Sequence, residues 1–296
     1  MPWLQLRIHT DRDQAAGLED ALLESGAVSV TLQDNADQPI LEPALGETPL
    51  WDKTLLTGLF DADIETESKT AQIAASYRKP MPQHRWELLE DKDWEREWMK
   101  NYQPIHCGGE LWICPSWLPA PDPEATNLML DPGLAFGTGT HPTTFMCLQW
   151  LAEQGDNLKG LSLVDYGCGS GILGIAALLF GAQTVVGTDI DPQALTATAD
   201  NAERNGLARD RFPVYLPKDC PAQTVDVTLA NILAGPLAEL APELNRLTRP
   251  GGRLCLSGIL NTQAQAVMDA YQAWFDFDPI RQQEEWVCLT ATKRQP

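Results

Sequence analysis

Three alternating glycines preceded by an acidic residue form the part of the sequence best suited to bind a ligand. The stretch LVDYGCGSGILGIAA, residues 163–177, leads from an apolar run through Gly167, Gly169 and Gly171 into a helix-like segment. Glycine permits a sharp turn and a close backbone approach, and a helix that begins there presents unpaired N–H groups. We therefore expect a small-molecule site at this strand-to-helix turn, rather than a tight turn alone.

Two classes of ligand fit the glycine pattern. Gly169, Gly171 and Gly174 satisfy GxGxxG, the dinucleotide fingerprint, and an acidic residue follows about 20 residues later. However, Asp165 precedes the turn, and a carboxylate is unfavourable beside a pyrophosphate and favourable beside a cation. Asp-x-Gly-x-Gly-x-Gly resembles the first motif of the class I methyltransferases, whose ligand S-adenosylmethionine carries an ammonium and a sulfonium but no phosphate. Asp165 can serve that ammonium through water or orient the loop.

Two aspartates follow the next predicted strand, and we expect different roles for them. Asp189 ends the strand 184–189 and is placed to accept hydrogen bonds from both hydroxyls of a ribose. Carboxylates give charge-assisted bonds that are roughly twice as strong as neutral ones. Asp191 directly precedes Pro192, which is typical of the cap and first turn of a helix. The predicted ribose-binding residue is therefore Asp189.

A polar residue, Asn231, closes the apolar strand predicted at 224–231 in TVDVTLANIL. One interpretation is a strand-end cap. The other is a resemblance to the Asn-Pro-Pro-Tyr motif of nitrogen methyltransferases, in which the asparagine oxygen accepts a hydrogen bond from the target nitrogen. The sequence here continues with Ile232 and Leu233, so the stacking aromatic is missing. That departure argues against a flat base or amide as the target and leaves a flexible aliphatic amine.

The predicted elements divide the chain into two folded parts. Before residue 91 they follow the order β-α-β-β-α-β, typical of a small ferredoxin-like α+β domain, at 3–8, 12–26, 27–34, 58–63, 66–78 and 85–90. A charged helix at 91–103 carries Trp94 and Trp98 on one face and is the predicted linker. We expect domains at 1–90 and 105–296, joined by the linker 91–104.

Strands and helices alternate from residue 161 onward, with helices expected at 236–246 and 261–272 among them, which predicts an α/β domain with a doubly wound, mostly parallel sheet. The segments 111–117 and 127–133 form a β-layer that leads into it. Ligands of such sheets lie beyond the carboxyl ends of the strands at the switch point. The loop after strand 161–166 is therefore the expected site. The upstream stretch LDPGLAFGTGTHPTT, 130–144, is expected to be a binding loop in which His141 is structural and Thr144 begins or caps a helix.

The charge of the chain excludes some partners and favours others. The net charge is −20, and no cluster of basic residues suggests a nucleic-acid surface. Residues 1–67 hold fourteen Asp and Glu against three Lys and Arg, which makes that part −11. An acidic surface attracts basic partners. Two interpretations of the acidic charge of residues 1–67 remain open: it keeps the protein soluble, or it docks a basic partner.

Cysteine spacing and hydropathy indicate a cytoplasmic protein without a metal site. The seven cysteines are scattered without a CxxC pair, so neither a disulfide framework nor a zinc site is predicted, and the four histidines are dispersed. No apolar run reaches the roughly 18 residues of a membrane span, and no signal peptide is apparent. We expect no membrane partner.

Several longer stretches together resemble one family, the PrmA-type protein methyltransferases, which modify the eleventh protein of the large ribosomal subunit. The matching stretches are LEDKDWEREWM, LWICPSW, LDPGLAFGTGTHPTT, VDYGCGSGIL, DIDPQAL, NAERNG, ANILAGPL and the late EEW. GTGTHPTT and ANILAGPL are far more specific than the glycine run. The resemblance covers essentially the whole chain. It implies a seven-stranded class I methyltransferase sheet behind a small substrate-recognition domain that grips a basic ribosomal protein.

The same resemblance implies S-adenosylmethionine as the cofactor and methylation of lysine side-chain and N-terminal amines. Carried over by position, the cofactor contacts are Thr144, Gly167, Asp189 and Asn231, and we assign Asn231 to positioning the amine as the catalytic residue. Two other functions remain open from the residues. One is a dinucleotide-dependent oxidoreductase that uses the GxGxxG register, and the other is a non-enzymatic ribosome-assembly factor that docks through its acidic end.

Overall fold

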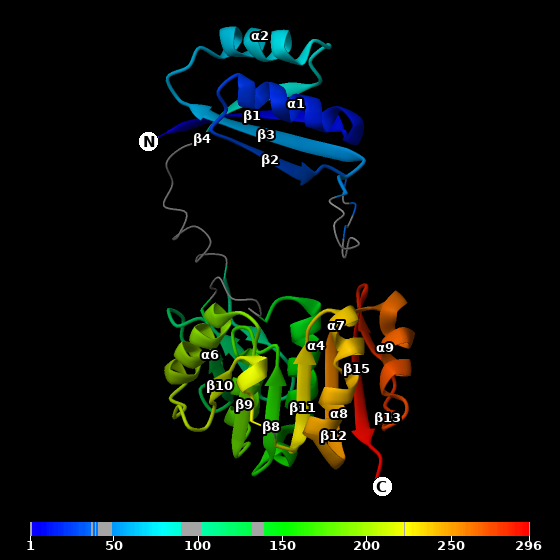
Figure 1. The fold of residues 1–296 in the computed structure, drawn as a ribbon. Helices are drawn as coiled ribbons and strands as arrows, with labels where there is room; N and C mark the ends of the chain where they lie inside the picture. Colours follow the sequence, from blue (N-terminus) through cyan, green and yellow to red (C-terminus); the bar gives the residue numbers. More distant parts are fainter. Residues whose placement is uncertain are drawn as a thin grey trace. The chain divides into compact units, whose positions relative to one another are not determined.

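The chain forms two compact units, Met1–Met99 and Lys100–Pro296 (Figure 1). The computed structural model describes residues 2–36, 38, 40, 49–89, 102–131, 139–221 and 223–295. The predicted linker helix and its two tryptophans, Trp94 and Trp98, lie outside the described residues. Within the described part of the chain, no helix combines the length and the hydropathy that crossing a membrane requires.

The first unit is a four-stranded antiparallel sheet with two helices on one face (Figure 1). Its elements are β1 (Trp3–Asp11), α1 (Arg12–Glu24), β2 (Ser29–Asp34), β3 (Lys53–Asp61), α2 (Thr66–Tyr77) and β4 (His84–Leu89). The strand order β2-β3-β1-β4 is that of a split β-α-β arrangement. The predicted small ferredoxin-like α+β fold is therefore confirmed.

Local signals in the sequence explain these helices, and the unit has a core of its own. The carboxylate of Asp11 caps α1 by accepting from the backbone N–H of Gln14 at 3.1 Å, and Glu65 caps α2 in the same manner. Alternate residues of β1, Leu6 and Ile8, are fully buried beneath the helices, in one hydrophobic cluster with Phe60 of β3. Burial of one face of the sheet fixes the register of the strands.

The second unit is built on a large sheet with strand order β10-β9-β8-β11-β12-β15-β13, and β14 pairs with β15 beside this path. These strands are β8 (Ser162–Tyr166), β9 (Thr184–Thr188), β10 (Val214–Tyr215), β11 (Val225–Asn231), β12 (Thr248–Leu260), β13 (Phe275–Phe277), β14 (Arg281–Gln283) and β15 (Trp286–Lys293). Strands β8 to β12 pair in parallel, and β15 runs antiparallel to β12. The doubly wound, mostly parallel sheet is confirmed, with seven strands on the main path and β14 as an addition.

Helices cover both faces of this sheet (Figure 1). They are α4 (Pro142–Gln154), α5 (Ile172–Leu179), α6 (Pro192–Arg204), α7 (Ala234–Glu239), α8 (Ala241–Leu247) and α9 (Ala264–Tyr271), with short 3-10 turns η1 (Gly155–Leu158), η2 (Pro217–Asp219) and η3 (Asn261–Gln263). Strand residues alternate between two hydrophobic clusters, so that Leu163 packs with α4 and α5 while Val164 packs with α7 and α8. This alternation is the period-two pattern of a sheet buried on both faces.

Three local features differ from the predictions. The helix predicted at 236–246 is two helices that meet at Leu240, because Pro242 has no N–H to continue the ladder. The helix predicted from 261 begins at Ala264 after a 3-10 turn. The leading β-layer is a separate three-stranded sheet of β5 (Ile105–His106), β6 (Leu111–Cys114) and β7 (Thr126–Met129).

The order of the strands defines where a ligand binds. The chain runs from β8 outward to β9 and β10 and then returns to β11 on the other side of β8. The loops after β8 and β11 therefore diverge at a switch point, at the carboxyl edge of the sheet. Gly167 follows β8 at this edge, Asp189 follows β9, and Asn231 is the last residue of β11.

Candidate functional site

The glycine turn after β8 is tightly packed against the turn after β11. Gly167 has a φ of 79°, and a Cβ built on it would lie 2.2 Å from Cγ2 of Ile232. Its N–H donates to the carbonyl of Thr188 on β9 at 2.7 Å. Because the left-handed conformation and the close approach both exclude a side chain, only glycine fits at position 167. The absence of a side chain at Gly167 thus allows the turns after β8, β9 and β11 to pack together.

Asp165, one residue before the end of β8, orients the helix that follows the turn. Its carboxyl group is 1% exposed, and Oδ2 accepts from the N–H of Gly174 in α5 at 2.9 Å. Burial, partly opposed by this hydrogen bond, raises the pKa of Asp165 to about 7. Of the two roles considered for this residue, the geometry supports orientation of the turn and the helix.

Asp189 ties the glycine turn to the loop after β9. Its Oδ2 accepts from the N–H of Gly169 at 2.9 Å, and its Oδ1 accepts from the N–H of Asp191 at 3.0 Å. Each carboxylate oxygen has a further lone pair, and the residue is partly exposed. These two backbone bonds fix the carboxylate at the carboxyl edge while leaving it able to accept from a diol.

Asn231 and Thr144 form a hydrogen-bonded pair beside the same edge. The side-chain nitrogen of Asn231 donates to the hydroxyl of Thr144 in α4 at 3.1 Å, and Thr144 is fully buried. The amide oxygen Oδ1 of Asn231 is buried and has no hydrogen-bond partner among the described residues. A buried acceptor without a partner is costly, so a ligand or a water molecule that donates to Oδ1 would stabilise it.

Two residues near the site have structural roles. His141 is the N-cap of α4: its Nδ1 accepts from the N–H of Thr143 at 3.3 Å, and its ring packs edge-on against Trp286. The expectation of a structural histidine is met, whereas Thr144 neither begins nor caps α4, which starts at Pro142. Asp191 caps α6 by accepting from the N–H of Gln193 at 2.8 Å, as predicted.

The sequence did not single out Ile190 as a site residue. This side chain is 85% exposed although it directly follows Asp189 at the carboxyl edge. A large apolar side chain held in solvent offers a surface to a flat apolar group. The sequence could have indicated this exposure, because an isoleucine between two aspartates at the end of a strand is poorly placed to be buried in the hydrophobic core.

The donors and acceptors at this edge fit an adenosine ligand, which S-adenosylmethionine and a dinucleotide both contain. Asp189 offers a carboxylate to a ribose diol, and Ile190 offers apolar surface to a purine ring. Asn231 adds a buried oxygen that needs a donor. The partly exposed carboxylate nearest the glycine turn, Asp189, opposes a pyrophosphate and suits a cation.

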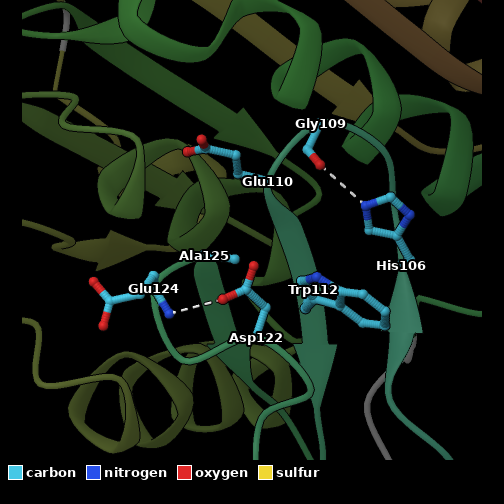
Figure 2. Close-up of a pocket in the computed structure, with 7 residues that line it drawn as sticks. All are labelled: His106, Gly109, Glu110, Trp112, Asp122, Glu124 and Ala125. Atoms are coloured by element: carbon cyan, nitrogen blue, oxygen red, sulfur yellow. Dashed lines mark hydrogen bonds between the residues drawn. The ribbon is translucent and has the colours of Figure 1, made fainter.

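A separate hollow lies on the three-stranded sheet of the second unit (Figure 2). Its volume is about 290 Å³, and its lining residues are His106, Gly109, Glu110, Trp112, Asp122, Glu124 and Ala125. The rings of His106 and Trp112 have centroids 4.6 Å apart, and Asp122 accepts from the N–H of Glu124 at 3.0 Å. None of the predicted site residues lines this hollow, so it is distinct from the edge that holds Gly167, Asp189 and Asn231.

Comparisons with known proteins identify the family. Residues 2–294 match the family described as "Ribosomal protein L11 methyltransferase (PrmA)". Proteins called ribosomal protein L11 methyltransferase from Cellvibrio japonicus and Saccharophagus degradans are 66% and 60% identical, over 99% of this chain and 99% and 100% of their own. The crystal structure of a ribosomal protein L11 methylase from Lactobacillus delbrueckii subsp. bulgaricus is similar with a TM-score of 0.57 and 31% identity, over 66% of this chain and 100% of that one. The chain therefore belongs to the ribosomal protein L11 methyltransferase (PrmA) family, whose members are S-adenosylmethionine-dependent protein methyltransferases.

Proposed function

We propose that this chain transfers methyl groups from S-adenosylmethionine to lysine side-chain amines and the N-terminal amine of ribosomal protein L11, in the cytoplasm. Membership of the family supports the reaction and the protein substrate. The observation that carries the site assignment is the buried, unpartnered Oδ1 of Asn231 at the carboxyl edge, where the described residues offer it no donor. An amine N–H of the substrate supplies the missing donor.

Four residues are proposed to hold the cofactor: Thr144, Gly167, Asp189 and Asn231. Asp189 accepts from the ribose hydroxyls through the lone pairs that Gly169 and Asp191 leave open. Gly167 shapes the turn beside the ligand, because its lack of a side chain lets the backbone pack closely against Ile232. Thr144 keeps the amide of Asn231 in place. When bound, the cofactor supplies an electrophilic methyl group on a sulfonium.

Asn231 is proposed to position the amine that receives the methyl group. Its Oδ1 accepts one N–H of a neutral amine, which directs the nitrogen lone pair. Keeping a lysine neutral at pH 7 costs roughly 4.6 kcal/mol, and an N-terminal amine costs only about 1–1.4 kcal/mol. Since a nearby cation lowers the pKa of an amine, its proton leaves to solvent without a dedicated base. Correct alignment of the two reactants contributes roughly 7–11 kcal/mol.

The first unit is proposed to recognise the basic substrate, with residues 1–90 as the recognition domain, 91–104 as the linker and 105–296 as the methyltransferase domain. Residues 1–67 carry a charge of −11, which favours docking of a basic protein. The unit has a hydrophobic core of its own around Leu6, Leu56 and Phe60. A folded acidic module is suited to this role because it presents its charges on a fixed surface.

The Asn231→Ala variant tests the site assignment. We expect kcat for methylation of L11 to fall roughly tenfold to hundredfold, because about 1.4–2.7 kcal/mol of hydrogen bonding is lost. Asn245→Ala is the matched control, since Asn245 in α8 also has a buried Oδ1 without a described partner but lies away from the carboxyl edge. Full kcat and unchanged cofactor affinity in Asn231→Ala would remove the proposed role of this residue.

A further inference from the structure

Three cysteines that are far apart in the sequence meet in the core of the second unit. Cys147 comes from α4, Cys255 from β12 and Cys288 from β15, and all three are fully buried free thiols. The sulfur of Cys255 lies 3.8 Å from that of Cys147 and 3.6 Å from that of Cys288. All three sulfurs lie within 4.8 Å of one another. Helix α4 packs directly on β12 and β15 (Figure 1). This packing brings the three thiols together.

The spacing of these sulfurs matches that of a trigonal metal site. A metal ion about 2.3 Å from each of three sulfurs in one plane holds those sulfurs about 4.0 Å apart. Two of the separations, 3.6 and 3.8 Å, are close to that value, and the third is within 4.8 Å. An ion can therefore be accommodated with small movements of side chains already in contact. Rigid preorganisation of this kind favours binding because little ordering remains.

The donor set selects the class of ion. Among the described residues, no histidine, aspartate or glutamate joins the three thiols. Structural zinc almost always takes four ligands, and hard ions prefer oxygen. Three thiolates in an apolar core suit a soft cation that accepts three-coordination, of which copper(I) is the example among biological metals. Trp150, Leu151 and Leu229, which belong to the same buried cluster, offer no competing donor.

We propose that Cys147, Cys255 and Cys288 form a three-coordinate thiolate site for a soft monovalent cation such as copper(I). Binding exchanges protons for metal: three thiols and one copper(I) ion give one copper–trithiolate centre and three protons, without any change of oxidation state. The bound ion links α4 to β12 and β15. It lies behind the edge that holds Asn231, because Cys147 follows Thr144 by one turn and Ser257, two residues after Cys255, pairs in register with Asn231.

The proposed entry route for the ion is the edge of the sheet. The short strand β14 pairs only with β15 in the described chain, and its Arg281 lies opposite Cys288. Arg281 is held to Glu153 of α4 by an ion pair whose first contact is 2.7 Å. Since a short edge strand opens more readily than the central strands, local release of β14 exposes Cys288 to an incoming ion.

The test is a titration of the full-length, reduced chain with copper(I) under anaerobic conditions. Copper(I) is supplied as its complex with a chromophoric bathocuproine chelator, and zinc(II) is titrated in parallel. A Cys220→Ser background removes the one cysteine that is partly exposed. In that background we compare Cys147→Ala, Cys255→Ala and Cys288→Ala with Cys107→Ala. Cys107 is the matched control, because it is also fully buried in the same cluster but lies outside the group of three thiols.

We expect the Cys220→Ser protein and its Cys107→Ala variant each to take one copper(I) ion per chain from the chelator, with a rise in Tm. The other three variants should take none. X-ray absorption of the loaded background protein should show three sulfur ligands, a readout that does not require the alanine variants to fold. The proposal would be overturned if a variant that lacks one of the three thiols still bound copper(I), or if X-ray absorption showed fewer than three sulfur ligands or ligands of another kind. It would also be overturned if the Cys220→Ser protein could not take copper(I) from the chelator, or if it bound zinc(II) equally well.

Discussion

The side-chain nitrogen of Asn231 donates to the buried hydroxyl of Thr144 across 3.1 Å, and this contact leaves the amide oxygen of Asn231 unpartnered among the described residues. One residue comes from the last position of β11 and the other from the first turn of α4, 87 positions apart in the chain. The pair therefore joins two elements at the edge where the strand order reverses. The orientation of the asparagine depends on the threonine.

Removal of the threonine hydroxyl should slow methyl transfer. In Thr144→Val, the amide of Asn231 loses its fixed acceptor, and we expect kcat on L11 to fall roughly tenfold, the equivalent of about 1.4 kcal/mol. Thr144→Ser keeps the hydroxyl and should retain most of the rate. The measurement is single-turnover methylation with both variants, alongside cofactor affinity by calorimetry. Equal rates in valine and serine variants would show that the hydroxyl does not orient Asn231.

Two neighbouring aspartates should separate cofactor binding from stability. Asp189→Ala should weaken binding of S-adenosylmethionine roughly tenfold to hundredfold, because a charge-assisted acceptor for the ribose is lost. Asp191→Ala should instead lower stability by about 1 kcal/mol through loss of the α6 cap, with cofactor affinity nearly unchanged. Calorimetric titration and urea unfolding measure the two effects. A larger affinity loss in Asp191→Ala than in Asp189→Ala would contradict the assignment.

The buried carboxyl group of Asp165 should make folding stability fall as the pH rises. Its folded pKa of about 7 exceeds the unfolded value, so the folded state holds a proton that the unfolded state releases between those two values. This contribution is fully present below the unfolded pKa and is lost as the pH rises through 7. Between pH 5 and pH 8 the loss is about 3 kcal/mol.

Asp165→Asn removes this titration while keeping an oxygen that accepts from the N–H of Gly174. We therefore expect the stability of the asparagine variant to depend less steeply on pH than that of the unmodified protein. Urea unfolding of both proteins at pH 5 and pH 8 gives the comparison. Parallel pH dependences would mean that the proton on Asp165 does not contribute.

Deletion of residues 1–90 should abolish methylation of L11 and leave cofactor binding nearly intact. The hydrophobic clusters of the two units share no residue in the described chain, so the remaining unit retains its core. High salt should weaken methylation by the full chain for the same electrostatic reason. Unchanged turnover of L11 by the truncated chain would remove the docking role of the acidic end.

The convergence of three candidate site residues was predictable from the sequence, because parallel strands end at one edge. Gly167, Asp189 and Asn231 each follow or close a predicted strand, and alternation of strands with helices implies that such ends converge. The same alternation correctly predicts the doubly wound sheet. Polar residues at the ends of apolar runs therefore give the strongest local indication of a binding site in this sequence, because such residues are not readily buried in an apolar core.

Other features depend on tertiary contacts that spacing does not reveal. Asp165 is inaccessible because α5 begins over it, which decides between two roles that remained open in the sequence. Cys147, Cys255 and Cys288 are separated by more than thirty residues each, and they meet only because α4 packs across β12 and β15. The break at Leu240 was readable in principle from Pro242, because a proline interrupts the helix ladder.

The most direct test of the central claim is mass spectrometry of purified L11 after incubation with the full chain and S-adenosylmethionine. L11 should gain mass in whole methyl steps, the added groups should lie on lysine side chains and the N-terminal amine, and Asn231→Ala should slow every step. L11 that remains unmodified with active cofactor present, or methyl groups found only on atoms other than amine nitrogen, would rule out the proposed reaction.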